Sequence, residues 1–388
     1  MQNKPRILVS NGGYKHTLGA VRWLAADGFE VDAIGSRHCI CASSRYLHDV
    51  AISEDVFNEQ GFPEFQSFLE QAQYDVFLPI SSNAVALAAR HIHELQPHCR
   101  VPIAELSKVE LCFDKARINA FAANHGVNGP RTWQPLSRSD LEQMLPEIQF
   151  PVVVKRLSEL GDLPTRYVDH ADDLRKLFDS LIDGAIPLES WPVIQQRIVG
   201  PGEGLFALYD RGVCKRVFMH RRIRELPPTG GASCCAVSIF EDDLKLAGTR
   251  LLDALAWHGV AMVEFKRDHS TGKLSLIEIN PKFWGSLDLA LESGVNFPAL
   301  AARIALGQDI GYSEHYRVGL KYHWPLNGEL KHVSERPRSL VPVLLDCLDP
   351  RVRSNIWLRD LGPALHSLRQ QFGAVTGGIV RKPGGQAP

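Results

Sequence analysis

The chain has 388 residues, of which 45% are hydrophobic and 22% are charged, and these proportions are ordinary for a folded globular protein. A chain of this length can bury a large core, and we expect it to divide into two to four domains. The formal net charge of −1 argues against a nucleic-acid-binding surface as the main function, and no apolar run has the length of a membrane helix or a signal peptide.

Eight cysteines are scattered along the chain without a Cys-x-x-Cys pair. This usage predicts reduced thiols in a cytoplasmic protein.

The first 105 residues alternate short apolar strands with helical patterns. The strand RILVS ends at Asn11-Gly12-Gly13 and precedes an amphipathic stretch, and the strands FEVDAIG and YDVFLPISS follow. This order predicts a parallel sheet whose functional edge lies at the carboxyl ends of the strands. Gly12, Gly13 and Gly19 lack the GxGxxG spacing, and Asp32 lies inside its strand, so a dinucleotide site is disfavoured. The glycines favour a tight turn, which could hold an acidic group at the helix N-terminus.

Residues 106–125 are predicted to form one helix with Asp114-Lys115 in its middle. The β-branched strand VVVKRL follows Phe150-Pro151 and contains Lys155, which is either a solvated strand end or a point charge for a nucleotide phosphate. The loop after it, residues 158–168, contains one glycine and one proline. It is a plausible but poor phosphate-covering loop.

Residues 191–204 are predicted to be an apolar strand that runs into a loop with three glycines, and a hairpin that turns at residues 210–212 follows. Near its end, His220, Arg222 and Arg224 alternate and are expected on one strand face. Such a row suits a polyphosphate or a carboxylate, because Arg binds these groups bidentately. A solvated charged edge is the competing interpretation.

Two further strands, VAMVEF and KLSLIEIN, surround a polar turn at residues 270–272. If the turn is centred on Thr271, Glu264 lies directly across from Glu278, and Asn280 shares the face of Glu278. Opposed carboxylates repel each other, and a hard divalent cation such as Mg²⁺ removes this repulsion. The hairpin therefore predicts a metal site with three oxygen ligands, with two acids at a solvated edge as the alternative.

These segments, in this order, resemble the ATP-grasp superfamily, in particular the carbamoyl-phosphate-synthase-like carboxylate–amine ligases. The resemblance covers roughly residues 1–310 and rests on Asp114-Lys115, VVVKRL, VIQQRIVGPGEG, RRIRELPPTGGAS, VEF and IEINPKFWGS. It implies an α/β and α+β ATP-grasp fold with three parts, which we assign to a Rossmann-like domain at 1–105, a linker helix and lid subdomain at 106–190, and a catalytic subdomain at 191–335. Residues 336–388 are expected to be a C-terminal extension.

The resemblance also implies ATP with Mg²⁺, or Mn²⁺ in its place. ATP would contact the side chains of Lys115 and Lys155, the backbone near Gln196, Arg197 and Ile198, and Glu203 at the ribose. The metal ligands would be Glu264, Glu278 and Asn280. Charge on the transferring group or the substrate carboxylate would be handled by Arg222, Arg224 and Lys282. The family often has Arg at the position of Lys282, which keeps the charge and loses the bidentate fork.

Such enzymes phosphorylate a carboxylate with ATP and let an amine attack the acyl phosphate. For this chain the resemblance implies a small-molecule acid and amine as substrates, with no nucleic acid or membrane partner, and it is compatible with a homodimer. Two alternatives remain open: a nucleotide-binding protein of the same fold without ligase activity, and a Rossmann-type enzyme that uses only the N-terminal domain.

Overall fold

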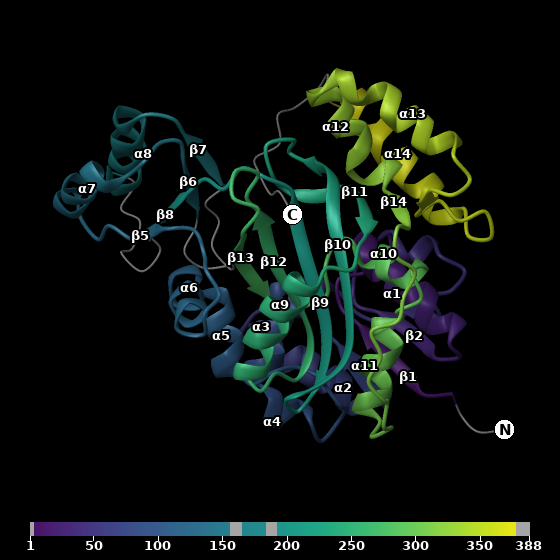
Figure 1. Cartoon of the computed structure of the whole chain (residues 1–388). Coiled ribbons are helices and arrows are strands. Elements are labelled where there is room, and N and C mark those ends of the chain that lie inside the picture. The colour runs from purple at the N-terminus through teal and green to yellow at the C-terminus, as the bar shows by residue number, and fades with distance from the viewer. Residues whose placement is uncertain (1–3, 156–164, 184–191, 378–388) are drawn as a thin grey trace.

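The computed structural model describes residues 4–155, 165–183 and 192–377. Three parts surround a long central sheet in Figure 1: the first unit at the lower right, a small lid at the upper left and the C-terminal helices at the upper right. Within the described residues, no helix combines the length and the apolar content needed to cross a bilayer.

The first unit is a four-stranded parallel sheet in the order β3-β2-β1-β4, as the alternating pattern predicted. Its strands are buried on both faces, which is why β1 reads as a continuous apolar run. Its elements are β1 (Arg6–Val9), α1 (Lys15–Ala26), β2 (Glu30–Ala33), η1 (Cys41–Ser43), β3 (Asp49–Val50), η2 (Glu54–Val56), α2 (Phe62–Ala72), β4 (Val76–Leu78), α3 (Ser82–Arg90) and α4 (Ile92–Leu95).

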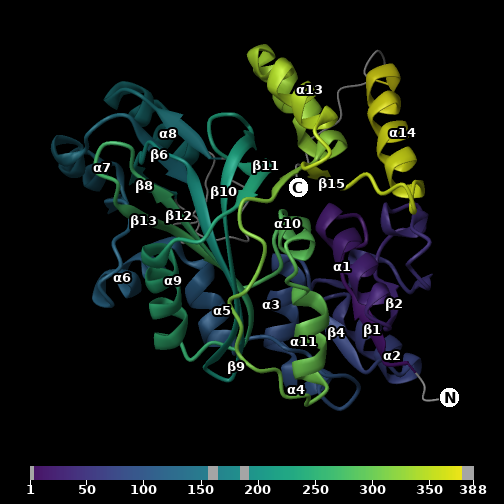
Figure 2. The same ribbon diagram turned by 45° about the vertical axis from the view of Figure 1, so that its right-hand side comes forward.

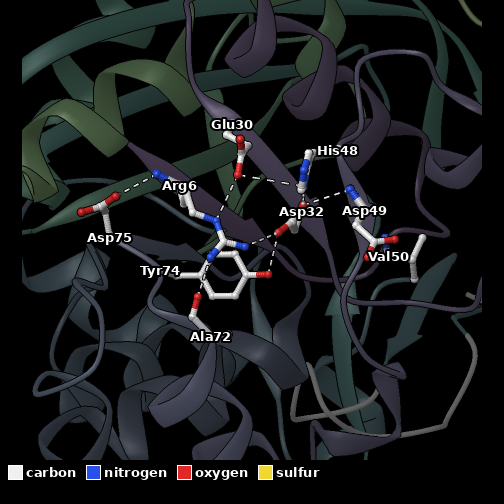
Figure 3. Close-up of polar contacts among 9 residues, drawn as sticks. All are labelled: Arg6, Glu30, Asp32, His48, Asp49, Val50, Ala72, Tyr74 and Asp75. Carbon is white, nitrogen blue, oxygen red and sulfur yellow. Dashed lines mark hydrogen bonds and ion pairs between the residues drawn. The ribbon is translucent and has the colours of Figure 1, made fainter. Parts of the chain in front are cut away.

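Asp32 in β2 is an internal ion-pairing group of this unit (Figure 3). Its carboxylate accepts hydrogen bonds from Arg6 Nη2 at 3.0 Å and Tyr74 Oη at 2.7 Å, and it lies 2.8 Å from His48 Nδ1. The side chain is therefore engaged inside the sheet, which agrees with the sequence-based argument against a ribose contact.

The helix predicted over residues 106–125 is two helices, α5 (Leu106–Phe113) and α6 (Lys115–Asn124), so this prediction was wrong. Asp114 between them has extended backbone angles, and its carboxylate accepts hydrogen bonds from the N–H groups of Ala116 and Arg117. An aspartate in this geometry is a strong helix N-cap, so α6 begins anew at Lys115.

The lid is a four-stranded antiparallel sheet in the order β5-β8-β6-β7, with helices on one face. Its elements are β5 (Thr132–Trp133), α7 (Arg138–Met144), η3 (Leu145–Glu147), β6 (Val152–Lys155), β7 (Arg166–Val168), α8 (Ala171–Asp183) and β8 (Val193–Gln196). Because β8 pairs with β5 and β6, the lid extends past the boundary predicted at residue 190. The next strand follows shortly in the sequence, so hydrophobic pattern alone did not separate the two sheets.

The central sheet has seven strands in the order β13-β12-β9-β10-β11-β14-β15 and is antiparallel except for its last pair. Its strands are β9 (Gly202–Asp210), β10 (Val213–Leu226), β11 (Ala232–Ser238), β12 (Gly259–Arg267), β13 (Leu274–Asn280), β14 (Lys321–His323) and β15 (Arg353–Ser354). Since β15 comes from the predicted C-terminal extension, that extension is part of the central sheet.

Each face of the central sheet packs against a different set of elements. One face shares a core with the first unit, α10 (Leu287–Glu292) and α11 (Phe297–Ala305), and Figure 2 shows these two helices beside α1. The other face packs against α9 (Asp242–Ala254), α5 and α6. The C-terminal elements are the kinked turn η5 (Pro325–Glu329), α12 (Leu330–Glu335), η6 (Pro337–Ser339), α13 (Leu340–Leu348) and α14 (Gly362–Gly377).

Candidate active site

Glu264 on β12 and Glu278 on β13 are paired directly across the hairpin, as the sequence predicted. The ladder then shifts register, because Phe265 pairs with Leu276 and leaves Ile277 as an extra residue. This bulge moves the centre of the closing turn from Thr271 to the bond between Ser270 and Thr271 and leaves the pairing of the two acids intact. Asn280 lies two residues after Glu278, and its Nδ2 donates to Glu278 Oε1 at 2.8 Å.

Glu278 is held as a carboxylate by the cations around it. Burial alone raises the pKa of Glu278, but Lys115, Lys155, the Asn280 amide and Lys282 outweigh burial and lower this pKa to about 2. Lys115 Nζ lies 3.7 Å from Glu278 Oε2. The predicted phosphate-binding lysines and the predicted metal ligand therefore occupy one site.

Glu264 experiences a different environment, although it lies opposite Glu278. Burial raises the pKa of Glu264, Arg222 lowers it and Glu278 raises it again, and the net direction is upward. Arg222 Nη2 donates to Glu264 Oε2 at 2.6 Å, while its Nη1 donates to Glu225 Oε1 at 3.2 Å. The guanidinium of Arg222 thus bridges Glu264 of the acid pair and the neighbouring carboxylate of Glu225.

Lys155 approaches this site from the lid. Val152 and Val154 on β6 belong to the core under the lid helices. Because side chains alternate along a strand, Lys155 lies on the other face of the lid sheet. Burial lowers the pKa of the Lys155 ammonium, and the carboxylate of Glu278 partly offsets this effect. The segment after it, residues 156–164, includes most of the predicted phosphate-covering loop and lies outside the described residues.

The predicted adenine contacts lie where the chain passes from the lid to the central sheet. Gln196 ends β8, and its N–H donates to the carbonyl of Arg131 at 2.8 Å. The guanidinium of Arg197 lies 5.1 Å from the centre of the Tyr167 ring, and the side chain of Ile198 is buried.

Glu203 is not brought together with the other predicted site residues. In the sheet, Gly204 lies beside Glu264, whereas Glu203 pairs with Phe265 and faces the opposite side. Both of its carboxylate oxygens accept from arginines there, Oε1 from Arg221 Nε at 2.7 Å and Oε2 from Arg267 Nε at 3.0 Å.

The predicted row of basic side chains on β10 is interrupted at Arg224. The ladder to β11 is irregular on both sides of this residue. Its Nε donates to Glu329 Oε1 at 2.6 Å, and its Nη2 donates to Asp346 Oδ2 at 2.5 Å. Arg224 is thus bound to the C-terminal elements, while Arg222 contacts the acid pair.

One cluster of potential metal ligands lies beside Arg224. Atoms of Cys235, Glu329 and Asp346 lie within 4.8 Å of one another. Arg224 and Lys321 already neutralise these carboxylates, so we interpret the cluster as an ion-pair network.

Lys282 connects the central sheet to the first unit. It follows Asn280-Pro281, and its Nζ donates to Ser82 Oγ, on the first residue of α3, at 2.7 Å. His220 lies on the same sheet face as Arg222, and its Nε2 is 2.7 Å from Ser286 Oγ. Burial lowers the pKa of His220 to about 3, so its imidazole is neutral.

Two residues near the acid pair and Lys282 were not singled out from the sequence. Glu225 shares the guanidinium of Arg222 with Glu264, and Lys15 begins α1 close to Gly285. The signal for Glu225 was its position three residues after Arg222 in the same basic run. Lys15 had only the glycine turn before its helix.

The donor set fits a hard divalent cation. Two opposed carboxylates and a neighbouring amide supply oxygen ligands, and the low pKa of Glu278 keeps it charged at neutral pH. Glu264, Glu278 and Asn280 are therefore the residues that would hold Mg²⁺.

Comparison with known proteins gives matches in sequence and in structure. Residues 230–325 match a family described as "ATP-grasp in the biosynthetic pathway with Ter operon". The carbamoyl phosphate synthase large chain of Thermotoga petrophila is 23% identical over 326 residues, which cover 77% of this chain and 28% of that protein. The chain thus spans less than a third of this relative's length.

Two solved structures show the same architecture. The biotin carboxylase domain of the Hydrogenobacter thermophilus 2-oxoglutarate carboxylase, in complex with MgADP and bicarbonate, has a TM-score of 0.65 and 16% identity, over 83% of this chain and 74% of that chain. L-amino acid ligase from Bacillus licheniformis has a TM-score of 0.59 and 16% identity, over 80% of this chain and 76% of that chain. These likenesses confirm the fold class predicted from the sequence.

Proposed function

We propose that the chain is a member of the ATP-grasp superfamily and that it is an ATP-dependent carboxylate–amine ligase. The observation that carries the proposal is the convergence of Lys115 and Lys155 on Glu278, opposite Glu264. Two cations from separate elements facing a pair of acids suit a metal-bound triphosphate. Two similar proteins, an L-amino acid ligase and a carbamoyl phosphate synthase large chain, support the same reaction class.

The proposed reaction has two steps. A carboxylate oxygen of the acid attacks the γ-phosphorus of ATP, and the bond to the bridging oxygen breaks to release ADP. The amine nitrogen then attacks the acyl carbon, loses a proton, and phosphate leaves with the electron pair of the broken C–O bond. Such chemistry depends on positioning and charge neutralisation and needs no covalent enzyme nucleophile.

Each site residue has a role in this scheme. Lys115 and Lys155 neutralise phosphate oxygens, and Glu264, Glu278 and Asn280 hold Mg²⁺ or Mn²⁺. Arg222 and Lys282 stabilise charge on the transferring group or orient the acid. A bound divalent ion would neutralise charge that develops on the phosphates. Arg224 takes no part in this scheme, because its guanidinium is bound to Glu329 and Asp346.

The partners that we propose are a small-molecule acid and amine, in a cytoplasmic protein that can form a homodimer. ADP release over a matrix of carboxylic acids and amines tests this function directly. ADP produced only when an acid and an amine are both present supports a ligase. Stabilisation by ATP–Mg²⁺ without ADP from any pair would favour a nucleotide-binding protein, and stabilisation by NAD alone would favour a Rossmann-type enzyme.

Glu278→Ala tests the metal assignment. We expect turnover to fall at least about 100-fold while the fold is kept, because one metal ligand is lost and two lysines lose their counter-charge. Glu241→Ala is the control, because Glu241 is ion-paired with Arg221 on the opposite side of the sheet. Turnover of Glu278→Ala equal to that of the control would refute the assignment.

A further inference from the structure

Lys15 begins α1 and lies between the first unit and the central sheet. Its Nζ donates to the carbonyl of Ser233 on β11 at 3.2 Å and to that of Asn327 at 3.5 Å, and it lies 4.6 Å from the centre of the Trp324 ring. Its Cε lies beside Gly285, in the loop that follows the predicted metal ligands. The ammonium therefore sits among groups that belong to three different segments.

Within residues 4–155, 165–183 and 192–377, Lys15 forms no ion pair with a carboxylate, although it is densely surrounded. Burial lowers the pKa of Lys15 to about 8, and Asp288 opposes this effect from a distance. The carboxylate of Asp288 accepts a hydrogen bond from Trp324 Nε1 at 2.8 Å instead. A cation withdrawn from water without a counter-ion is costly, so its retention points to an anion that comes from outside the chain.

His16 and Lys282 extend this region toward the acid pair. Burial lowers the pKa of His16 to about 3, and Lys15 and Lys282 lower it further. His16 is therefore a neutral imidazole in the field of both lysines, able to donate one hydrogen bond. Lys282 follows Asn280 by two residues and its Nζ donates to Ser82 Oγ at 2.7 Å, so its side chain reaches from the predicted metal ligands to the first unit.

A second chain of contacts joins Lys15 to the acid pair across the sheet. Ser233, whose carbonyl binds Lys15, pairs with Glu225 on β10. Glu225 accepts from Arg222, and Arg222 also donates to Glu264. Lys15 thus lies at the edge of the candidate active site, at the carboxyl ends of the strands of the first unit, where open α/β sheets bind ligands.

We propose that Lys15, His16 and Lys282 form an anion-binding subsite, and that the substrate acid carries a second anionic group, a carboxylate or a phosphate, which binds there. This inference rests on the proposed ligase function. The first carboxylate would lie near Arg222 and the acid pair, where it reacts, while the second would be the counter-ion of Lys15. The substrate class is therefore an acid with at least two negative groups.

Thermal unfolding of the full chain tests the subsite without turnover. The probes are succinate, inorganic phosphate and, as a monocarboxylate with the same number of carbons as succinate, butyrate. Each is titrated with Mg²⁺ and a saturating non-hydrolysable ATP analogue, so that the triphosphate site is filled. We expect succinate or phosphate to raise the Tm of the wild-type protein more than butyrate does, and whichever of the two acts at the lower concentration identifies the second group.

Lys15→Met should raise the half-saturating concentration of the effective anion about tenfold, which is the scale of one charge-assisted hydrogen bond. The Tm of the unliganded variant should equal or exceed that of the wild type, because a partly buried cation with no carboxylate partner among the described residues has been removed. Lys15→Arg should recover part of the response. Lys215→Met is the matched control. Lys215 lies near the start of β10, away from Lys15, has low exposure and is ion-paired with Asp309.

Responses to succinate and to phosphate that both fail to exceed the response to butyrate would overturn the inference. A wild-type half-saturating concentration in Lys15→Met would do so as well, and a lower Tm of the unliganded variant would show that Lys15 serves the fold. Failure of the ligase function is a separate result, because it appears as no ADP from any acid–amine pair while the binding responses persist.

Discussion

Single side chains in this molecule differ in pKa because of their neighbours, even where they lie opposite each other. The pKa of Glu278 is lowered to about 2, whereas that of Glu264 is raised. Burial acts on both in the same direction, but Lys115, the Asn280 amide and Lys282 appear among the causes that lower the pKa of Glu278 and not among those for Glu264. The pKa of a buried glutamate in this protein therefore depends mainly on the cations and hydrogen-bond donors around it.

His48 gives a test of this principle away from the site (Figure 3). The hydrogen bond to Asp32 raises the pKa of His48 above its ordinary value, while burial lowers it slightly. A raised folded-state pKa stabilises the protein below the unfolded pKa of about 6.5, and the contribution disappears as pH rises through the folded pKa. We expect His48→Asn to lower the free energy of unfolding at pH 5.5 by less than about 1 kcal/mol, because the side chain is half exposed, and to have little effect at pH 8.

Urea unfolding of both proteins at the two pH values measures this difference. His93→Asn, at an exposed histidine on α4, serves as the control. A pH-independent difference for His48→Asn would contradict the role of the Asp32 hydrogen bond.

At the scale of elements, a helix start determines where one site lysine lies. Asp114 caps α6, and Lys115 is the first residue of that helix. The cap therefore fixes both the beginning of the helix and the position from which Lys115 reaches Glu278. The two roles can be separated by comparing caps.

We expect Asp114→Ala to lower the free energy of unfolding by about 1 kcal/mol and to weaken ATP–Mg²⁺ binding, because an N-cap is lost beside Lys115, the lysine that we propose binds a phosphate. Ser137→Ala removes the cap of α7 in the lid and should cost about as much stability without the loss of affinity. Asp114→Asn should resemble the wild type, since asparagine is also a good cap. Urea unfolding and calorimetric titration give the two quantities, and equal affinities of Asp114→Ala and Ser137→Ala would refute the link to Lys115.

The sequence was most informative where a regular pattern was broken by one residue type. Glu264 and Glu278 were acids in apolar strands, and strand alternation with a short turn was enough to pair them. The bulge at Ile277 was not predictable, because an extra residue leaves the apolar pattern almost unchanged. Asp114 carried a cap signal that the helical periodicity around it obscured.

Long-range partners were the other limit of prediction. The sequence placed Glu203 near a strand, but the sheet face to which its side chain points depends on the pairing of β9 with β10 and β12. Arg224 looked like a continuation of the basic row, and its partners Glu329 and Asp346 lie more than 100 residues further along the chain. Lys15 had no motif at all, because its surroundings come from β11, Gly285 and Trp324.

At the scale of the whole molecule, Arg224 ties the central sheet to the C-terminal elements. Glu329 lies in η5 and Asp346 in α13, and Lys321 on β14 also contacts Asp346. The four charges balance, and Glu329 is fully buried. With β15 added to the sheet edge, this network holds the last part of the described chain against the body.

Arg224→Met should lower the free energy of unfolding by about 3–5 kcal/mol, because the buried carboxylates lose a partner. Arg224→Met combined with Glu329→Gln restores the balance of charge and should be less destabilised than the sum of the two single variants. Arg351→Met is a suitable control, since Arg351 is exposed and contacts only Asp349 within the described residues. Additive effects in urea unfolding would contradict a coupled network.

The core between the first unit and the central sheet also constrains how the chain can fold as it is synthesised. Val9 and Leu18, near the start, share that core with Leu289 and Phe297. The first sheet can form its strand pairs early. The apolar surface that α1 presents to α10 and α11 stays uncovered until nearly 300 residues have left the ribosome. Contacts between such distant residues slow folding and leave aggregation-prone intermediates with exposed apolar surface. We therefore expect chaperones to bind the nascent chain.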